Sequence, residues 1–494
     1  MKILWIDLNS SYAHSSLALP ALHAQIKDKS PYEWEMVSAT INENVGMVVE
    51  RIVAYQPDII AATMWLFNHE QLLHITSRAK ALLPKACLIL GGPEFLGENE
   101  TFLRCNPFVD AVFRGEGEEH FPQWLSCWDN PTAWATIDGL CYLDENSVYH
   151  DNGKAKTSAF DLLVPPEESH FFNWDKPFVQ LETTRGCFNT CAFCVSGGEK
   201  PVRALPIDTI RQRLDTIHQH GIKNVRVLNR TFNANPRHAK ELLNLFLEYH
   251  PHIRFHLEIH PALMNDALKS ELTRMPKGLL HLEAGIQSLR EPVLQQCRRM
   301  GKLADAMEGL KFLCSQSNLD THADLIAGLP LYRLEDILED IHTLASYCTG
   351  EIQLELLKLL PGTEMRMRAE ELGIRYSPLP PYEVLQTNEC TTAELQTARQ
   401  LSRLLDAFYN TPAWQELTRT LILNEEGFLL QFLDYLNKRN LTDQPMSLEK
   451  RGLVLYEYCQ KHYPQYQIQA SIAWIEAGMS LKKKPAERAK TKHQ

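Results

Sequence analysis

Strand-length apolar runs alternate with amphipathic segments through the first quarter of the chain. Runs typical of buried strands occupy residues 3–7, 32–37, 58–63, 87–90 and 109–113. Between them, patterns with helical spacing start near Ser15 or Ser16 and cover residues 44–55 and 69–83. Strands that alternate with helices are typical of a doubly wound parallel sheet. We therefore predict a Rossmann-like α/β domain over residues 1–130, with its ligand-binding face at the carboxyl ends of the strands.

The same alternation returns after a proline-bearing connector at residues 163–168. Strand-like runs then occupy residues 178–184, 225–228, 255–259, 279–284, 320–326 and 351–357. Helical patterns lie between them, at residues 206–220, 242–249, 303–315 and 334–347. We assign residues 131–175 to a linker and residues 176–375 to a second α/β domain. Functional residues of such a domain belong at the C-terminal ends of its strands.

The remaining residues, 376–494, have a helical pattern. Thr391 and Glu394 have the spacing of a capping box, which predicts a helix start. Further helices are expected near residues 414–423, 428–436 and 448–463. The many aromatic residues in this part predict a helical domain with its own core, and the alternative is that some of them bind substrate.

The composition is that of an ordinary soluble globular protein, with 44% hydrophobic and 22% charged residues among 494. No apolar stretch approaches the length of a membrane span, and the N-terminal segment lacks the long apolar core of a signal peptide. We therefore expect a cytoplasmic protein with no membrane span. The net charge of −11 argues against a broad nucleic-acid-binding surface.

Three cysteines, Cys187, Cys191 and Cys194, lie close together in a C-x3-C-x2-C pattern, followed by Gly197 and Gly198. A disulfide framework uses an even number of cysteines, and a structural zinc site usually takes four ligands in two separated pairs. Three close thiolates on a loop instead suit an iron–sulfur cluster with one iron open to a non-protein ligand. The alternative is a zinc knuckle or a chance clustering. The other nine cysteines are scattered singly, as small buried apolar residues often are.

With Phe193 at the aromatic position, the triplet resembles the C-x3-C-x-aromatic-C signature of the radical S-adenosylmethionine (radical SAM) enzymes. The resemblance implies a 4Fe-4S cluster held by Cys187, Cys191 and Cys194, with the amino and carboxylate groups of S-adenosylmethionine on the fourth iron. It also implies reductive cleavage of S-adenosylmethionine to a 5′-deoxyadenosyl radical, with an electron donor such as flavodoxin or ferredoxin. The second α/β domain fits that family's partial (β/α)6 TIM barrel, in which the cluster loop follows the first strand.

The resemblance also implies residues that bind S-adenosylmethionine at the later strand ends. Asn229 and Arg230 replace the family's small-small-Glu motif after the second strand, and Arg230 could pair with a carboxylate in a bidentate manner. The candidates are Phe193, Asn229, Arg230, Glu258, Glu283, Gln287 and Gly328. For the carboxylates, the alternative is an ion pair inside the barrel. No catalytic residue is assigned.

Glycine-rich turns after the fourth and fifth strands of the first domain resemble those of the cobalamin-binding domain that precedes some radical SAM domains. The candidates for cobalamin binding are Ser11, His14, Ser15, Leu17, Thr63, Gly91, Gly92, Pro93, Glu94, Gly115, Glu116 and Gly117. The family's D-x-H-x-x-G motif, whose histidine replaces the lower cobalt ligand, is absent, although His14 lies in the right loop. Cobalamin then either binds without a histidine ligand or has been lost from the pocket. The alternative for His14 is a loop histidine bonded to the backbone.

The chain thus resembles a bacterial branch of cobalamin-domain radical SAM enzymes that carries a helical C-terminal domain. The implied activity is cobalamin-dependent methyl transfer to an unactivated position of a small-molecule or lipid substrate. A radical rearrangement, cyclisation or oxidation without methyl transfer is the second hypothesis, and a non-catalytic cobalamin or redox sensor is the third. Methylthio transfer is disfavoured because the first domain lacks a second cysteine triplet. The substrate is not encoded in any motif that we recognise.

Overall fold

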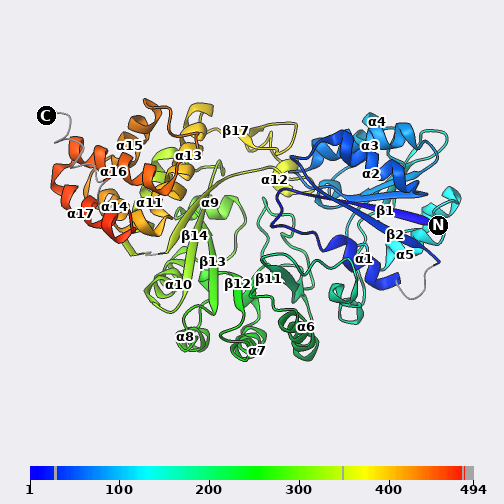
Figure 1. The fold of residues 1–494 in the computed structure, drawn as a ribbon, viewed down its shortest axis with the longest axis horizontal. Coiled ribbons are helices and arrows are strands. Elements are labelled where there is room, and N and C mark those ends of the chain that lie inside the picture. The colour runs from blue at the N-terminus through cyan, green and yellow to red at the C-terminus, as the bar shows by residue number, and fades with distance from the viewer. Residues whose placement is uncertain (27–30, 348–349, 481–482, 484–494) are drawn as a thin grey trace.

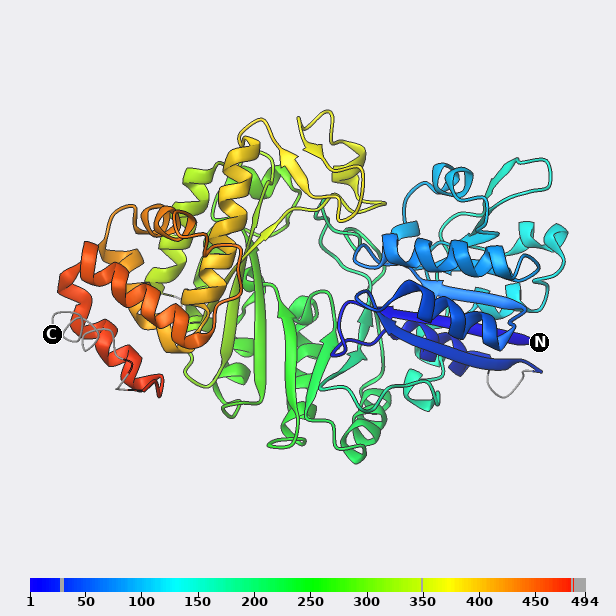
Figure 2. The same ribbon diagram turned by 45° about the horizontal axis from the view of Figure 1, so that its top comes forward.

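The computed structural model describes residues 1–26, 31–347, 350–480 and 483. The chain folds into three parts that follow one another along the long axis of the molecule (Figure 1). An α/β domain that contains the N-terminus forms one end, a curved sheet lies in the middle, and a group of helices forms the other end (Figures 1 and 2). The fold class expected from the sequence is confirmed.

The first domain is built on a seven-stranded sheet with the order β2-β1-β3-β4-β5-β6-β7. Its strands are β1 (Lys2–Asn9), β2 (Glu33–Thr40), β3 (Ile59–Thr63), β4 (Cys87–Gly91), β5 (Ala111–Phe113), β6 (Leu140–Leu143) and β7 (Tyr149–Asp151). Its helices are α1 (Ala18–Ile26), α2 (Val45–Tyr55), α3 (His69–Leu82), α4 (Glu100–Cys105) and α5 (His120–Leu125). Strands β1 to β5 are parallel, so the point where the strand order reverses lies between β1 and β3.

Both faces of this sheet are buried, which explains why its strands read as continuous apolar runs. Leu4 and Ile6 of β1 pack in a core with α2, α3 and α4, whereas Ile3 and Trp5 pack in a second core with α1 and α5. Residues 140–151, which we expected to belong to a linker, extend the sheet as the antiparallel strands β6 and β7. The first sheet therefore reaches further along the chain than its parallel part.

The middle part is a six-stranded, all-parallel sheet with the order β15-β14-β13-β12-β11-β8. Its strands are β8 (Val179–Glu182), β11 (Asn224–Leu228), β12 (Arg254–Ile259), β13 (Leu280–Gln287), β14 (Asp320–Ala327) and β15 (Glu351–Leu356). Its helices are α6 (Ile207–Gln219), α7 (Pro236–Leu247), α8 (Asp266–Thr273), α9 (Glu291–Gln296), α10 (Leu303–Ser315) and α11 (Leu334–Tyr347). The strand order and the crossover helices confirm the partial barrel.

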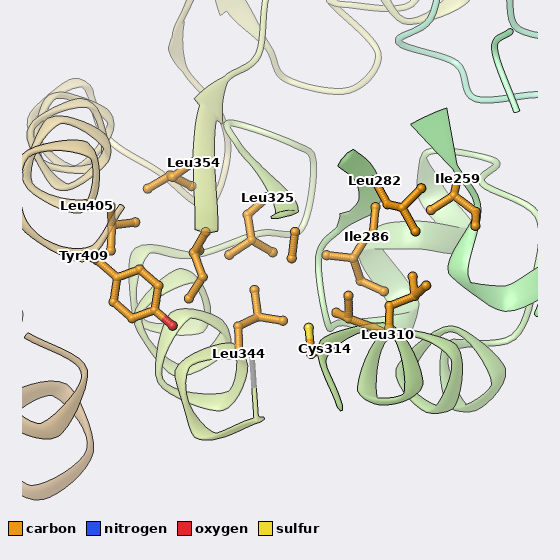
Figure 3. Packing of buried hydrophobic residues seen from close by; sticks show 14 of the residues in the cluster. Ile259, Leu282, Ile286, Leu310, Cys314, Leu325, Leu344, Leu354, Leu405 and Tyr409 are labelled. Atoms are coloured by element: carbon orange, nitrogen blue, oxygen red, sulfur yellow. The ribbon is translucent and has the colours of Figure 1, made fainter. Parts of the chain in front are cut away.

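Alternation along these strands separates an apolar outer layer from a polar interior. Leu282 and Ile286 of β13 are buried, and Figure 3 shows them in one layer with Leu310 and Cys314 of α10. The alternate positions of β13, which include Glu283, are only partly buried and point to the other side of the sheet. The barrel interior is therefore lined by the residues that the apolar pattern leaves out.

A short hairpin and a helical domain complete the chain. They comprise α12 (Glu364–Met367), β16 (Arg375–Tyr376), β17 (Val384–Gln386), α13 (Thr392–Leu404), α14 (Pro412–Asn424), α15 (Phe428–Asn437), α16 (Leu448–His462) and α17 (Gln467–Glu476). The capping box of Thr391 and Glu394 starts α13 as predicted. Phe408, Trp414 and Phe432 are fully buried, so the aromatic residues form a core. Among the described residues, no helix is both long and apolar enough to cross a membrane.

Candidate functional site

The cysteine loop follows the first strand of the barrel and is held at both ends. Strands β9 (Thr184–Arg185) and β10 (Arg203–Ala204) pair in antiparallel fashion and bring its two ends together. Inside the loop, the backbone N–H of Cys187 donates to the carbonyl of Glu199 at 3.0 Å, and that of Gly198 donates to the carbonyl of Asn189 at 2.6 Å. The loop is therefore shaped by its own backbone before any ligand binds.

The loop is also tied to distant parts of the barrel. The Ala192 N–H donates to the Cys297 carbonyl at 2.9 Å, and the Ala192 carbonyl accepts from the Met365 N–H at 2.8 Å. The Thr190 hydroxyl donates to the Arg298 carbonyl at 3.0 Å. Phe193 is partly buried against the barrel core. These contacts fix where the three thiols lie.

The donor set of the loop fits an iron–sulfur cluster. Cys187 and Cys191 are buried, Cys194 is half-buried, and all three thiols are free. Burial raises the pKa of the Cys191 and Cys194 thiols, and each thiol also feels the charge of its neighbours in the triplet. Arg299 opposes this shift, since its guanidinium lies 3.6 Å from the Cys191 sulfur. The loop thus offers three thiols beside a cation. Three thiols can hold three of the four irons of a 4Fe-4S cluster, which leaves one iron open.

Arg230 and Glu258 face the same space as the loop. Burial raises the pKa of the Glu258 carboxyl, and the Arg230 charge opposes that rise. Arg230 likewise favours the thiolate of Cys194. The buried Asn229 instead accepts a hydrogen bond from the Thr231 N–H at 3.3 Å, which shapes the turn after β11. Arg230 and Glu258 are thus placed to meet a ligand of the cluster, whereas Asn229 supports the turn.

The ends of β13 and β14 are irregular. Gln287 has a φ of 71° at a break in the β13–β14 register, and its buried Oε1 has no hydrogen-bond partner among the described residues. A positive φ at a residue with a side chain stores strain, and such strain gathers at functional sites. Gly328, after β14, has a φ of 89° that favours glycine. Both predicted residues therefore lie at special backbone positions at the barrel mouth.

Glu283 does not stand free in the barrel but belongs to a chain of histidines that we did not predict. His256 Nε2 lies 3.0 Å from Glu283 Oε2, and His281 lies between His256 and His322. Burial opposes ionisation of Glu283, but His256 and His322 hold its pKa below the usual range. Burial lowers the pKa of His281 to about 3. In the sequence, each of these histidines is only an interior position of its own strand. The three positions can be recognised as neighbours only when the register of the strands is known.

At the first sheet, the turn after β3 presents two aromatic rings. Trp65 and Phe67 are stacked with centroids 6.2 Å apart, and they stay 36% and 38% exposed. The buried side chain of Asn68 fixes this turn, because it donates to the carbonyls of Leu8 (2.9 Å) and Thr63 (3.1 Å) and accepts from the Trp65 N–H (2.8 Å). A flat apolar surface therefore lies where the strand order reverses, the usual ligand position in such sheets.

The residues predicted to bind cobalamin in the loop after β1 lie near the contact with the barrel. The ring of His14 lies 2.8 Å from the hydroxyl of Ser11 through Nδ1 and meets Phe178 edge-on at 5.8 Å. Ser15 is half-buried and Leu17 packs against the barrel core. His14 thus points to the contact with the barrel.

The glycine pair at the end of β4 lets the loop after β4 cross closely over the loop after β3. Gly92 has a φ of 110°, and a Cβ there would lie 2.6 Å from the carbonyl oxygen of Met64 and 2.7 Å from Cγ2 of Thr63. Only glycine allows this approach. Gly91 ends β4, and Pro93 starts a short 3-10 turn. The Gly91-Gly92 motif therefore supports the turn that carries Trp65.

The carboxylates of the two glycine-rich motifs join the domains. Glu94 is buried and lies 2.9 Å from His69 Nδ1, while the Tyr382 hydroxyl donates to it at 2.6 Å. Glu116 pairs with Arg185 at 3.3 Å and with both terminal nitrogens of Arg203. Burial opposes ionisation of Glu116, but the arginines bring its pKa to about 2.

The neighbouring glycines of the second motif pack in the same contact. Gly115, with a φ of 107°, lies against the backbone of Ala155, and Gly117 lies against Leu22. The cobalamin contacts predicted at Gly115, Glu116 and Gly117 are partly exposed residues, and protein groups lie against each of them.

These features define a class of protein: a doubly wound ligand-binding domain joined to a partial barrel that carries a three-cysteine loop. Comparison with known families gives the same division. Residues 6–125 match the B12 binding domain, residues 181–344 match the radical SAM superfamily, and residues 370–476 match a family described as protein of unknown function (DUF4080). The barrel therefore matches the radical SAM superfamily over residues 181–344, and the match to the B12 binding domain lies ahead of it along the chain.

Individual relatives are distant. The chain is 26% identical over 204 residues to an uncharacterised methyltransferase of Pyrococcus horikoshii, covering 40% of this chain and 44% of that protein. It is 21% identical over 348 residues to the cobalamin-dependent radical SAM methyltransferase TokK of Streptomyces tokunonensis, covering 65% and 50%. The chain thus spans about half the length of the curated relatives it matches.

A solved structure is similar over nearly the whole chain. It is the cobalamin-dependent S-adenosylmethionine radical enzyme OxsB, solved with aqua-cobalamin and S-adenosylmethionine bound. The TM-score is 0.66 at 13% identity, covering 97% of this chain and 82% of that chain. At this identity the likeness establishes the fold.

Proposed function

We propose that the protein is a radical SAM enzyme that transfers a methyl group to an unactivated position of a small-molecule substrate, with the help of cobalamin. Cys187, Cys191 and Cys194 would hold a 4Fe-4S cluster, and Arg230 and Glu258 would contact S-adenosylmethionine. When bound, the cluster supplies single electrons for cleavage of the sulfonium, and the corrinoid serves as a methyl carrier. The residues of the chain bind, orient and shield these groups.

The observation that carries this proposal is the way the first domain meets the open side of the barrel. At the β8 edge of the barrel sheet, Arg185 pairs with Glu116, from the loop after β5. At the β15 edge, Gly362 lies against the backbone of Leu96, from the loop after β4, and Tyr382 binds Glu94. The strand ends of the first sheet therefore face the interval between the two edge strands of the barrel.

This arrangement suits chemistry shared by two cofactors. A ligand on the Trp65–Phe67 surface and a ligand on the cysteine loop would both border the space between the domains. We propose that a corrinoid rests on that aromatic surface without a protein histidine on cobalt, since the D-x-H-x-x-G motif is absent and His14 is engaged by Ser11. The substrate would bind between the two cofactors, and a flavodoxin or ferredoxin type of protein would supply electrons.

Anaerobic reconstitution tests the proposal. The full chain is loaded with iron, sulfide and hydroxocobalamin and incubated with a reductant and S-adenosylmethionine that carries a deuterated methyl group. We expect 5′-deoxyadenosine together with a labelled methyl group on the retained corrinoid. Cleavage of S-adenosylmethionine without label on the corrinoid would reject methyl transfer and leave a radical reaction of another type. A bound cluster with no turnover at all would reject the enzyme and support a sensor.

A further inference from the structure

Three histidines and two carboxylates lie together inside the barrel. They come from three neighbouring strands: His256 from β12, His281 and Glu283 from β13, and His322 and Asp324 from β14. His256 Nε2 lies 3.0 Å from Glu283 Oε2, and His256 Nδ1 lies 3.3 Å from His281 Nδ1. His281 Nε2 lies 3.0 Å from His322 Nδ1. The chain of ring nitrogens therefore runs from Glu283 to His322 and returns toward Glu283.

The hydrogen bonds assign a tautomer to each ring, as such networks usually do. An ionised Glu283 can only accept a hydrogen bond, so His256 donates to it from Nε2–H, and a neutral His256 has its lone pair on Nδ1. His281 must then donate from Nδ1 and accept at Nε2, and His322 must donate from Nδ1. With neutral rings, the lone pair of His322 is therefore on Nε2.

Two carboxylates lie near that lone pair. His322 Nε2 lies 3.5 Å from Glu283 Oε2 and 3.5 Å from Asp324 Oδ1. The His322 side chain is only 3% exposed, and neither its Nε2 nor Asp324 Oδ1 has a hydrogen-bond partner among the described residues. Buried polar atoms are rarely left in this state, and a bound ion between them would satisfy both.

The spacing fits a metal ion better than it fits a direct hydrogen bond. An N–H···O bond is usually about 2.9 Å long, well below the separations found here. Ligands at about 2.1 Å from a tetrahedral zinc ion lie about 3.4 Å from one another. One donor atom from each of Glu283, His322 and Asp324 lies within 4.8 Å of the other two.

We infer that Glu283, His322 and Asp324 bind a zinc ion inside the barrel, apart from the cysteine loop. His281 accepts a hydrogen bond from Nδ1 of His322, and His256 donates one to the Glu283 carboxylate. Metal ligands in proteins commonly have such outer hydrogen-bond partners. The side chain of Glu283 is 37% exposed, which provides an entry path and a fourth position open toward the barrel interior. An oxygen or nitrogen atom of a ligand in the barrel could occupy that position. The inference does not depend on the proposed methyl transfer.

The test measures zinc on the full chain with its iron–sulfur cluster in place. After incubation with zinc sulfate and dialysis, we expect about one zinc per chain by elemental analysis. Zinc-edge X-ray absorption should show only nitrogen and oxygen neighbours at about 2.0–2.1 Å. Zinc at the cysteine loop would show sulfur at about 2.3 Å instead. Retention of no zinc, or of sulfur-bound zinc alone, would overturn the inference. A proton shared among Glu283, His322 and Asp324 would then explain their arrangement.

Variants locate the ion. Asp324→Asn and His322→Gln should lose the retained zinc, and His281→Gln should weaken zinc affinity about 10–100-fold because it removes only the outer support. His150→Gln is the matched control, since His150 lies 3.0 Å from the carboxylate of Asp144, and no third candidate ligand lies beside this pair among the described residues. The iron content and thermal unfolding of each variant check that it folds. Zinc retained by both ligand variants would contradict the assignment.

Discussion

The two parallel sheets of this protein use their strand ends in opposite ways. At the first sheet, the ligand face is lined by glycine backbone and two exposed aromatic rings, and the motif carboxylates Glu94 and Glu116 turn away into contacts with the barrel. In the barrel, thiols, carboxylates and histidines point inward. One sheet thus offers a flat apolar surface and the other a set of thiols, histidines and charged groups.

The difference shows that a motif at a strand end does not reveal whether its side chains contact a ligand or another part of the protein. Glu94 and Glu116 stand in the turns that a ligand would approach, yet their partners are Tyr382 and Arg203, far away in the chain. The glycines next to them allow the close packing that these contacts need. If the comparison is right, changes at the barrel face should affect chemistry, and changes at the first sheet should affect stability or corrinoid affinity.

The largest effect is expected at the cysteine loop. Cys191→Ala removes a cluster ligand, so cluster absorbance and 5′-deoxyadenosine formation should fall to background, while corrinoid retention should stay at the wild-type level. Cys297→Ala is the control, because this buried thiol lies beside the loop but outside the triplet. Loss of the corrinoid together with the cluster in Cys191→Ala would show that the two faces are not independent.

The next largest effect is expected at the crossing of the β3 and β4 loops. Gly92→Ala places a Cβ 2.6 Å from the Met64 carbonyl and imposes a φ of 110° on alanine. We expect a loss of about 3 kcal/mol in the free energy of unfolding, measured by denaturant titration. Gly153→Ala is the control, since Gly153 has a φ of 83° with open space around it. Equal losses in both variants would mean that backbone strain alone, without the crossing, explains the glycine.

A smaller effect is expected at the domain contact. Glu116→Gln leaves Arg203 without its carboxylate partner, whereas Arg185 keeps Glu118 and Glu182, and the change should cost about 2 kcal/mol at neutral pH. Because the folded-state pKa of Glu116 is lowered to about 2, this stabilisation is present above its ordinary value near 4.5 and is lost as the pH falls toward 2. The gap between wild type and variant should therefore close in acid.

The matched control for the domain contact is Glu100→Gln, which removes an exposed helical pair with Arg104 and should cost less than about 0.5 kcal/mol. Chemical unfolding of the three proteins between neutral and acid pH measures both differences. A gap for Glu116→Gln that stays constant with pH would contradict the ion-pair role.

The smallest effect is expected on corrinoid binding. Trp65→Ala halves the aromatic surface and should weaken hydroxocobalamin binding about tenfold, or about 1.4 kcal/mol, by spectroscopic titration. Trp65→Phe should recover most of the affinity. Leu82→Ala removes an exposed apolar side chain at the end of α3 and should change nothing. Unchanged affinity in Trp65→Ala would place the corrinoid elsewhere.

Much of the fold was predictable because buried parallel strands are continuous apolar runs, and this pattern marks both sheets. The cysteine triplet was also visible, since its spacing is local. The roles of Glu94 and Glu116 at the domain contact were not, because Tyr382 and Arg203 come from other parts of the chain. The sequence does not predict the contact between His256, His281 and His322. Each is a single histidine in its own strand, and only the register places the three side by side.

The most direct test of the account is the cofactor content of one anaerobically purified and reconstituted sample of the full chain. We predict about four iron atoms and about one corrinoid per chain, with the corrinoid retained through gel filtration. A chain that holds the cluster but releases all of the corrinoid would contradict the central claim that the two strand-end faces serve two cofactors.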